Sequence, residues 1–414
     1  MKELFNEYVK SIDTYIMFRI KQKAAQLKPE LEAKDRAPIA LAMGAPVAPP
    51  PEFVYKKLVE ALKIPQIHTY SSPKGENFYL EAIAKRMKTR FNVELNPKTE
   101  IFSLIGSKEG IANFIRALIN PTTDKKQQDI ILVPDPGYAS YTQMVKTSGG
   151  LSFGIELNKQ NNYMPDMYKV WEDVKKSGLD TSKIKAMIIN YPSNPLGATC
   201  TKEYLQHVVD FCKEKQIWLI SDAAYCDLYF DEQNKPHSVL EVNGAKDVAV
   251  EFYSFSKPYS MTGFRLGWIC GNADAVGTFG RLKSTIDTGL FKALQKCAAE
   301  VINSKEGDDY IAQANIKFKE KQMILINGLR KLGWDIKDTD IPKATFYIWQ
   351  PIPPRYKTSE EFTQDLLETS GIVAVPGIGF GKKGEGYFRM SAVANNVDLE
   401  EVINRMEKDG FNYS

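Results

Sequence analysis

Short apolar runs separated by helix-like segments recur through the first two thirds of the chain, and they constrain its fold more than any other feature. In the run Ala186-Met187-Ile188-Ile189 every side chain is apolar, so both faces of this strand must be covered. Alternation of such strands with helices predicts an α/β fold with a mostly parallel sheet between helices. Sheets of this kind bind ligands at the carboxyl ends of their strands. The expected strands are 101–104, 129–133, 151–157, 185–190, 217–221, 248–253 and 266–270.

A chain of 414 residues exceeds one ordinary core, so we expect two subdomains. The N-terminal part contains an arm leading into a helix (5–27), a short strand (38–46) and an extended crossing at Pro49-Pro50-Pro51. A helix at 279–303 is expected to carry the chain out of the sheet domain. The C-terminal part is predicted to be a smaller α+β domain, with helices at 318–331 and 399–406 and strands at 345–349 and 387–391. The expected units are an N-terminal arm with part of the small domain (1–45), a large domain (46–290) and a small C-terminal domain (291–414).

Charge and composition exclude several classes of protein. The net charge is only +3 with the signs interleaved, which provides no basic field for nucleic acid. Five scattered cysteines and three histidines favour reduced thiols over a zinc site, so we expect no metal. No apolar segment approaches the ~20 residues needed to span a bilayer, and the N-terminus does not resemble a signal peptide. We therefore expect a cytoplasmic protein with no membrane or nucleic-acid partner.

The most informative motif follows the predicted strand 248–253. In Ser254-Phe255-Ser256-Lys257, with Arg265 downstream, two hydroxyls and a guanidinium surround one lysine. Hydroxyls and a forked guanidinium suit a phosphate dianion. A lysine beside another cation loses its proton more easily and attacks a carbonyl. Phosphate plus carbonyl describes pyridoxal 5′-phosphate held as an imine, so Ser254, Ser256 and Arg265 are predicted to bind this cofactor and Lys257 to be catalytic. The alternative is a surface lysine followed by an ordinary arginine.

Two residues at the end of the predicted strand 217–221 fit the same cofactor. A buried carboxylate without a partner is costly, and the ring nitrogen of the cofactor would be the partner of Asp222. This pairing keeps the ring cationic, so that it can store carbanion electrons. Tyr225 is predicted to donate to the phenolic oxygen of the cofactor and to lower the pKa of the imine. A helix cap is the competing role for Asp222.

Three further turns carry cofactor-binding candidates. Gly106-Ser107-Lys108-Glu109-Gly110 presents backbone N–H groups and a hydroxyl at a helix N-terminus, where an anion is stabilised, so Ser107 and Lys108 are candidates. Tyr138 offers a ring that can stack on the pyridine. Asn194 can donate to the phenolic oxygen or reach a substrate carboxylate. A ligand-free glycine turn, a tyrosine packed on the sheet edge and a turn-forming asparagine are the respective alternatives.

Residues from other parts of the chain are expected to hold the substrate. Arg389, on the predicted strand 387–391, suits an α-carboxylate through two parallel bonds, although a surface ion pair is the commoner role of an arginine. Gly44 lets the backbone approach a ligand, and Tyr15 on the N-terminal arm should line the same mouth. The glycines of 377–381 precede a strand rather than a helix, so we interpret them as turns rather than a nucleotide loop.

Taken in order from Tyr15 to Arg389, these motifs closely resemble those of class I/II aminotransferases, which are fold-type I pyridoxal-phosphate enzymes. The Lys257 stretch is similar to the Schiff-base segment of the family, and Asn194-Pro195-Leu196-Gly197 to its N-P-x-G motif, with leucine where threonine is common. The segments 106–110, 133–138 and 376–381 look most like those of LL-diaminopimelate and aspartate aminotransferases. The resemblance implies a seven-stranded sheet in the large domain. It also implies a homodimer with shared active sites, in which Tyr70 reaches the phosphate of the neighbour.

Two lysines bear on the choice of substrate. Relatives specific for diaminopimelate tend to carry a glutamate near the position of Lys74, which suits a distal ammonium, so the charge is reversed here. Lys292 falls where an asparagine or glutamine of the partner subunit reaches the site in the family. Two lysines favour a distal carboxylate, and we therefore expect aspartate or glutamate to be a better amino donor than diaminopimelate. The alternative is two solvated lysines that touch no substrate.

The reaction that the resemblance implies is ping-pong transamination. The donor amine displaces Lys257, which then acts as general base at the α-carbon, and the amino group passes to a 2-oxo acid such as 2-oxoglutarate. A β-lyase on the same fold shares the removal of the α-proton and is one alternative. A regulatory protein that binds the cofactor is another, but it needs a DNA-binding domain, and no basic helix-turn-helix precedes Gly44.

Overall fold

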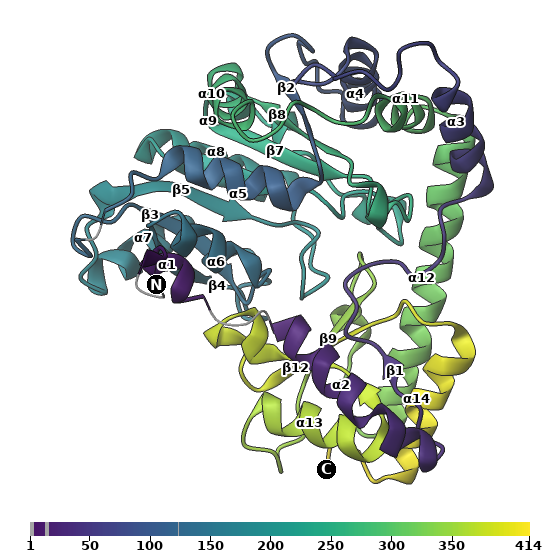
Figure 1. Ribbon diagram of the computed structural model, residues 1–414. Helices are drawn as coiled ribbons and strands as arrows, with labels where there is room; N and C mark the ends of the chain where they lie inside the picture. Colours follow the sequence, from purple (N-terminus) through teal and green to yellow (C-terminus); the bar gives the residue numbers. More distant parts are fainter. Residues whose placement is uncertain (1–3, 13–15, 123) are drawn as a thin grey trace.

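The computed structural model describes residues 4–12, 16–122 and 124–414, and in this part of the chain a seven-stranded sheet forms the centre of the large domain (Figure 1). The strand order is β2-β8-β7-β6-β5-β3-β4. β8 runs antiparallel to both of its neighbours, and the other pairs are parallel, so the predicted α/β fold is confirmed. The strands are β2 (Ile101–Leu104), β3 (Ile130–Asp135), β4 (Leu151–Glu156), β5 (Ile184–Ile189), β6 (Trp218–Asp222), β7 (Ala249–Ser254) and β8 (Gly267–Gly271).

Both faces of this sheet are buried, as the continuous apolar runs predict. Along β5, Ala186 and Ile188 join one hydrophobic cluster, whereas Met187 and Ile189 join another, because side chains alternate across a strand. The first cluster is completed by α5 (Ser107–Leu118), α6 (Ser140–Thr147) and α10 (Ala273–Lys283). The helices that contribute to the second include α4 (Asn77–Phe91), α7 (Met167–Lys176), α8 (Lys202–Lys215) and α11 (Lys292–Val301).

The small domain is built around a separate core. Its antiparallel sheet has the order β11-β12-β9, and a second pair joins β1 to β10 in parallel. Side chains from three helices and from the small sheet share this core. The elements are β1 (Ile39–Ala40), β9 (Tyr347–Pro351), β10 (Ile372–Val373), β11 (Val375–Pro376), β12 (Tyr387–Ser391), α13 (Ser359–Ser370) and α14 (Asn396–Lys408).

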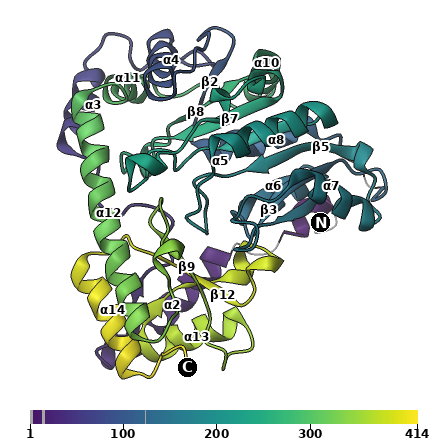
Figure 2. The ribbon, with the colours of Figure 1, turned by 180° about the vertical axis from the view of Figure 1, so that it is seen from behind.

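One long helix, α12 (Lys305–Lys331), connects the two domains, and Figures 1 and 2 show it running along one side of the molecule. Ile311 in its first half packs in a core of the large domain, and Leu325 in its second half packs in the core of the small domain. α11 packs against α3 (Glu52–Leu62) and α4. The chain therefore leaves the large domain within α12, beyond the boundary expected at residue 290.

The single helix predicted for 279–303 is wrong, because α10 and α11 are separate helices. α10 ends at Lys283, whose buried Nζ lies 2.6 Å from Oδ2 of Asp287. Asp287 also accepts a hydrogen bond from the backbone N–H of Gly289 at 3.0 Å. A carboxylate that bonds its own backbone closes a turn in competition with the helix. This turn separates the two helices.

The arm and helix predicted for 5–27 contain two helices, which attach to different domains. α1 (Glu7–Lys10) lies against α6 of the large domain, and α2 (Ile16–Ala33) packs against α13 of the small domain. None of the helices in the described ranges combines the length and the apolar character needed to cross a membrane. The five cysteines are free thiols.

Candidate active site

A cavity of about 580 Å³ lies where the carboxyl ends of β5, β6 and β7 meet the small domain. This volume is within the range of about 300–1,000 Å³ of small-molecule sites, and the position is the one expected for an open α/β sheet. The large domain contributes the turns that follow these strands and the N-terminus of α5. The small domain contributes β12, and α2 contributes apolar side chains together with Lys21.

Most of the residues selected from the sequence line this one cavity, although they come from distant parts of the chain. The lining includes Gly44, Ser107, Lys108, Tyr138, Asn194, Asp222, Tyr225, Ser254, Ser256, Lys257, Arg265 and Arg389. Tyr15 lies outside the described residues.

Three other candidates lie away from the cavity of this chain. The side chain of Tyr70 is 85% exposed. Nζ of Lys74 donates to the backbone carbonyl of Lys98, and Nζ of Lys292 donates to Oγ1 of Thr69 at 2.7 Å. Contact of these residues with a ligand stays a prediction that depends on a second subunit.

Lys257 follows β7, and its amine lies inside the cavity. Nζ donates to the backbone carbonyl of Gly44 and lies 5.5 Å from the centre of the Tyr225 ring. Burial and the charge of Arg389, with a smaller effect of Arg265, lower the pKa of Lys257 from 10.5 to about 8, although Asp222 opposes the shift. About one tenth of such amines are neutral at pH 7, a far larger share than for an ordinary lysine. The amine is therefore poised to act as a nucleophile or a base.

One end of the cavity forms a cradle for an anion. Gly106 caps the N-terminus of α5 with φ +109°, and a Cβ at this position would lie 2.6 Å from Nη2 of Arg265. The glycine thus lets a guanidinium lie beside the N-terminus of the helix. The hydroxyls of Ser107, Ser254 and Ser256 line the same cavity. Helix N–H groups, hydroxyls and a guanidinium together match a phosphate dianion.

A carboxylate lies at the end of β6. Asp222 is 6% exposed; Oδ2 accepts from the Tyr141 hydroxyl at 2.7 Å, and Oδ1 accepts from the N–H of Ala224 at 3.1 Å. Burial raises the pKa of Asp222, and these donors and Lys257 only partly offset the rise. A cationic ring nitrogen would supply the missing partner charge. Sequence reasoning missed Tyr141, although it lies only three residues after Tyr138, in the first turn of α6.

Arg389 on β12 has the geometry of a carboxylate clamp. Nη1 donates to Oδ1 of Asn194 at 2.8 Å, and Nη2 donates to the carbonyl of Ala42 at 2.7 Å. Its guanidinium carbon lies 4.4 Å from the centre of the Tyr347 ring and 4.7 Å from that of Phe380. Nε is buried and has no hydrogen-bond partner among the described residues. A donor left unpaired in a cavity wall suits an anionic ligand.

Tyr347 links both domains at the site, and sequence reasoning missed it. Its hydroxyl lies 2.6 Å from that of Tyr225 and 3.4 Å from the carbonyl oxygen of Gly44. Tyr347 lies opposite Ser391 in the pairing of β9 with β12, a long-range register that no local pattern reveals. With a reactive amine, an anion cradle, a buried carboxylate and an aromatic ring, the donor set fits pyridoxal 5′-phosphate.

Comparison with known proteins agrees with this chemistry. The family model for aminotransferase class I and II matches residues 36–406. The LL-diaminopimelate aminotransferase of Syntrophobacter fumaroxidans is 40% identical over 390 residues, which cover 94% of this chain and 96% of that protein. The substrate-bound BacF structure from Bacillus subtilis has a TM-score of 0.90 at 31% identity and covers 99% of both chains.

A Thermus thermophilus aspartate aminotransferase variant, 23% identical with a TM-score of 0.86 over 98% of this chain and 99% of its own, shares the fold. This fold is the fold type I that the sequence predicted. The family match supports transamination over the β-lyase and regulatory alternatives. The chain belongs to the aminotransferase class I and II family, and it is a pyridoxal-phosphate-dependent aminotransferase acting on an amino acid and a 2-oxo acid.

Proposed function

We propose that the amino donor is an acidic amino acid, aspartate or glutamate, and that the acceptor is a 2-oxo acid such as 2-oxoglutarate. The observation that carries this proposal is the charge of the cavity wall. Its described lining includes five cations and a single carboxylate, Asp222; the cations are Lys21, Lys108, Lys257, Arg265 and Arg389. The phosphate of the cofactor and the α-carboxylate of a substrate do not neutralise all the positive charge of this lining. The remaining charge favours a second carboxylate on the substrate. A distal ammonium would find no carboxylate other than Asp222 in this lining.

The chain supplies binding and proton transfer. Pyridoxal phosphate, when bound, supplies the electron sink that makes an α-proton removable. Ser107, Ser254, Ser256 and Arg265 are the residues that we propose to hold its phosphate, with Lys108 nearby.

Around the ring, we propose that Asp222 faces the nitrogen, Tyr138 stacks on the face and Tyr225 donates to the phenolic oxygen. Arg389 and Asn194 then orient the α-carboxylate of the substrate. The Lys257 amine acts as the base that takes the proton from the α-carbon, and it holds that proton on the same face of the site.

A homodimer with shared active sites is part of this proposal. The loop that carries Tyr70 is held by α11, because Lys292 donates to Thr69 and Nε2 of Gln295 donates to Oγ of Ser71 at 2.8 Å. Both contacts leave the exposed Tyr70 ring free to point away from this subunit. We propose that Tyr70 reaches the phosphate in the neighbouring cavity, with Lys74 and Lys292 near its substrate. A cytoplasmic location stays a prediction of the sequence.

A donor panel tests the proposal. Purified enzyme is incubated with 2-oxoglutarate and with aspartate, diaminopimelate, alanine or an aromatic amino acid, and with oxaloacetate for glutamate, while the visible absorption of the cofactor is followed. We expect the highest kcat/KM for aspartate or glutamate. Diaminopimelate is the second candidate, because it is the substrate named for the relative from Syntrophobacter fumaroxidans. Faster transamination of diaminopimelate than of aspartate would contradict the proposal.

A matched pair of variants separates charge from structure. Lys21→Met removes a cation of the cavity wall, and we expect it to raise KM for aspartate more than KM for alanine. Lys23→Met, on the same helix, removes a lysine that pairs with Glu368 at 3.0 Å instead, and should leave this ratio unchanged. Equal effects of both variants would show that the Lys21 charge does not select the donor.

A further inference from the structure

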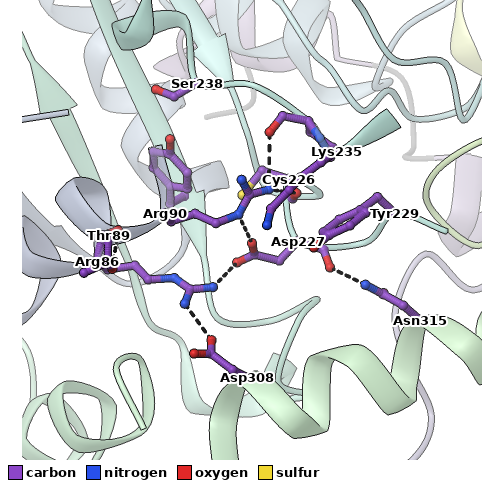
Figure 3. A network of polar contacts seen from close by, with 12 residues as sticks. Arg86, Thr89, Arg90, Cys226, Asp227, Tyr229, Lys235, Ser238, Asp308 and Asn315 are labelled. Atoms are coloured by element: carbon purple, nitrogen blue, oxygen red, sulfur yellow. Dashed lines mark hydrogen bonds and ion pairs between the residues drawn. The ribbon is translucent and has the colours of Figure 1, made fainter. Parts of the chain in front are cut away.

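Behind the active site, a buried ion network joins α4, α12 and the segment that follows β6. Figure 3 shows Asp227 between the guanidiniums of Arg86 and Arg90, with Asn315 approaching from the opposite side. Arg86 Nη2 donates to Oδ2 of Asp227 at 3.4 Å, and Arg90 Nε donates to Oδ1 at 3.2 Å. The side chains of all three charged residues are 13% exposed or less. None of them lines the cavity of the candidate active site.

The two arginines converge because they lie four residues apart on α4, on one face of the helix. Arg86 has a second carboxylate partner, since its Nη1 donates to Asp308 at 2.7 Å. Nη2 of Arg90 donates to the backbone carbonyls of Cys226 at 3.3 Å and of Pro236 at 3.2 Å. One face of α4 therefore binds both the side chain of Asp227 and the backbone beside it.

Asp227 is ionised in this network. Burial raises the pKa of its carboxyl, but the two guanidiniums outweigh this effect and hold the pKa below its usual value. The two arginines would repel each other across the same buried space without that charge. Removing one partner from such a group leaves uncompensated buried charge, which strongly destabilises the arrangement around it.

The network ends two residues from Tyr225. The segment between β6 and residue 230 belongs to no helix or strand, so its position depends on side-chain and loop contacts. Asn315 Nδ2 donates to the backbone carbonyl of Asp227 at 2.9 Å, and the N–H of Leu228 donates to the carbonyl of Tyr225 at 2.9 Å. At the other end, the carbonyl of Leu228 accepts from the N–H of Thr345, next to the small-domain sheet.

We propose that Asp227 is a positioning residue for transamination: held by Arg86 and Arg90, it sets the place of the Tyr225 hydroxyl beside Lys257 and Tyr347. The inference rests on the role proposed above for Tyr225 at the phenolic oxygen of the cofactor. It adds a function for a buried network that touches neither the substrate nor the cofactor.

The test compares two isosteric variants that each remove one carboxylate from Arg86. Asp227→Asn removes the carboxylate that holds the Tyr225 segment. Asp308→Asn is the matched control, because Asp308 pairs with Arg86 but is 58% exposed and lies on α12. The pH midpoint of the visible absorption of the cofactor-loaded enzyme is expected to rise by about one unit in Asp227→Asn and to stay unchanged in Asp308→Asn. In Asp227→Asn, kcat should fall about tenfold with little change in KM.

Two further measurements separate the inference from the proposed role of Tyr225. Tyr225→Phe alone should raise the same midpoint, and an unchanged midpoint there would refute the role of Tyr225. Adding Asp227→Asn to Tyr225→Phe should shift the midpoint no further, because both changes act through one hydroxyl. A second, additive shift would overturn the inference.

The apo-protein offers a readout that does not depend on the cofactor. Amide hydrogen exchange of residues 223–230 should accelerate in Asp227→Asn and not in Asp308→Asn. If Asp227→Asn unfolds more readily but keeps both the midpoint and the protection of this segment, the network is structural only and the inference fails. If Asp227→Asn cannot be purified in folded form, Arg90→Gln replaces it, because it leaves Asp227 with one arginine. The pH midpoint of the cofactor absorption and the hydrogen exchange of residues 223–230 then decide, with a smaller expected shift of the midpoint.

Discussion

Substitution of Gly106 by alanine tests the anion cradle most directly. The added Cβ would lie 2.6 Å from Nη2 of Arg265, closer than carbon and nitrogen atoms can approach, and a tight 3.3 Å from Cζ. Arg265 must therefore swing away, although its Nη1 is held by the carbonyl of Thr262 at 2.9 Å. The backbone at this position, φ +109° and ψ 154°, is also one that alanine rarely adopts.

The two consequences have separate magnitudes. Alanine in this backbone conformation costs about 1–3 kcal/mol of folding stability. Loss of one hydrogen bond to a charged group costs about 1.5–3 kcal/mol, which corresponds to an increase of roughly 10- to 150-fold in the Kd for pyridoxal phosphate. We expect Gly106→Ala to show both effects.

Titration of the apo-protein with pyridoxal phosphate, followed by absorption, measures the Kd, and urea unfolding measures the stability. Gly386→Ala is the matched control, since Gly386 also has a positive φ of +82° but open space within 4 Å of its Cβ. It should lose stability and keep its affinity for the cofactor. If Gly106→Ala binds the cofactor as tightly as the wild type, Arg265 and the N-terminus of α5 do not form the phosphate site.

Three other predictions concern Lys257 and Tyr141, which line the same cavity. Lys257→Ala should still bind the cofactor but turn over about 10²- to 10⁴-fold more slowly, because the base at the α-carbon is lost, and near-normal turnover would refute the assignment. Since burial and Arg389 lower the pKa of Lys257 from 10.5 to about 8 in the folded apo-protein, the unfolded state binds more protons between these values. The free energy of unfolding of the wild-type apo-protein, relative to that of Lys257→Met, should therefore rise with pH in that window by about 1.4 kcal/mol per pH unit. A difference between the two proteins that stays constant with pH in urea unfolding would contradict this reasoning. Tyr141→Phe removes a donor from Asp222, which should raise the pKa of that carboxyl further and lower kcat about tenfold; an unchanged pH profile of kcat would exclude this role.

Much of the fold was predictable from local patterns. Residues such as Met187 and Ile188 are apolar on both faces of β5, and only a sheet covered on both sides keeps them from water. The division of the helix at 279–303 was missed because apolar spacing alone does not show it, although the turn depends on local contacts of Asp287 with Lys283 and Gly289. The position at which the chain passes from the large to the small domain, within α12, was not predictable, because it depends on which core each half of this helix contacts.

The candidate site divides in the same way. Lys257, Asp222 and Asn194 each lie at or just beyond the carboxyl end of a strand of the large sheet, so their meeting at one edge follows from the order of the elements. Tyr141 could have been found from its spacing to Tyr138. Tyr347 and Asp227 could not, because their partners lie far away in the sequence.

The amino-acid sequence by itself indicated the sheet, and it predicted the lysine and the other residues that we propose to hold a pyridoxal cofactor, since each of these predictions depends on a short local pattern. Tertiary structure alone decided that Arg389 bonds to Asn194, that Tyr347 meets Tyr225 and that two arginines of α4 enclose Asp227. These contacts join segments separated by dozens to hundreds of residues. Burial in a shared core, rather than any local preference, supplies the free energy that brings such segments together.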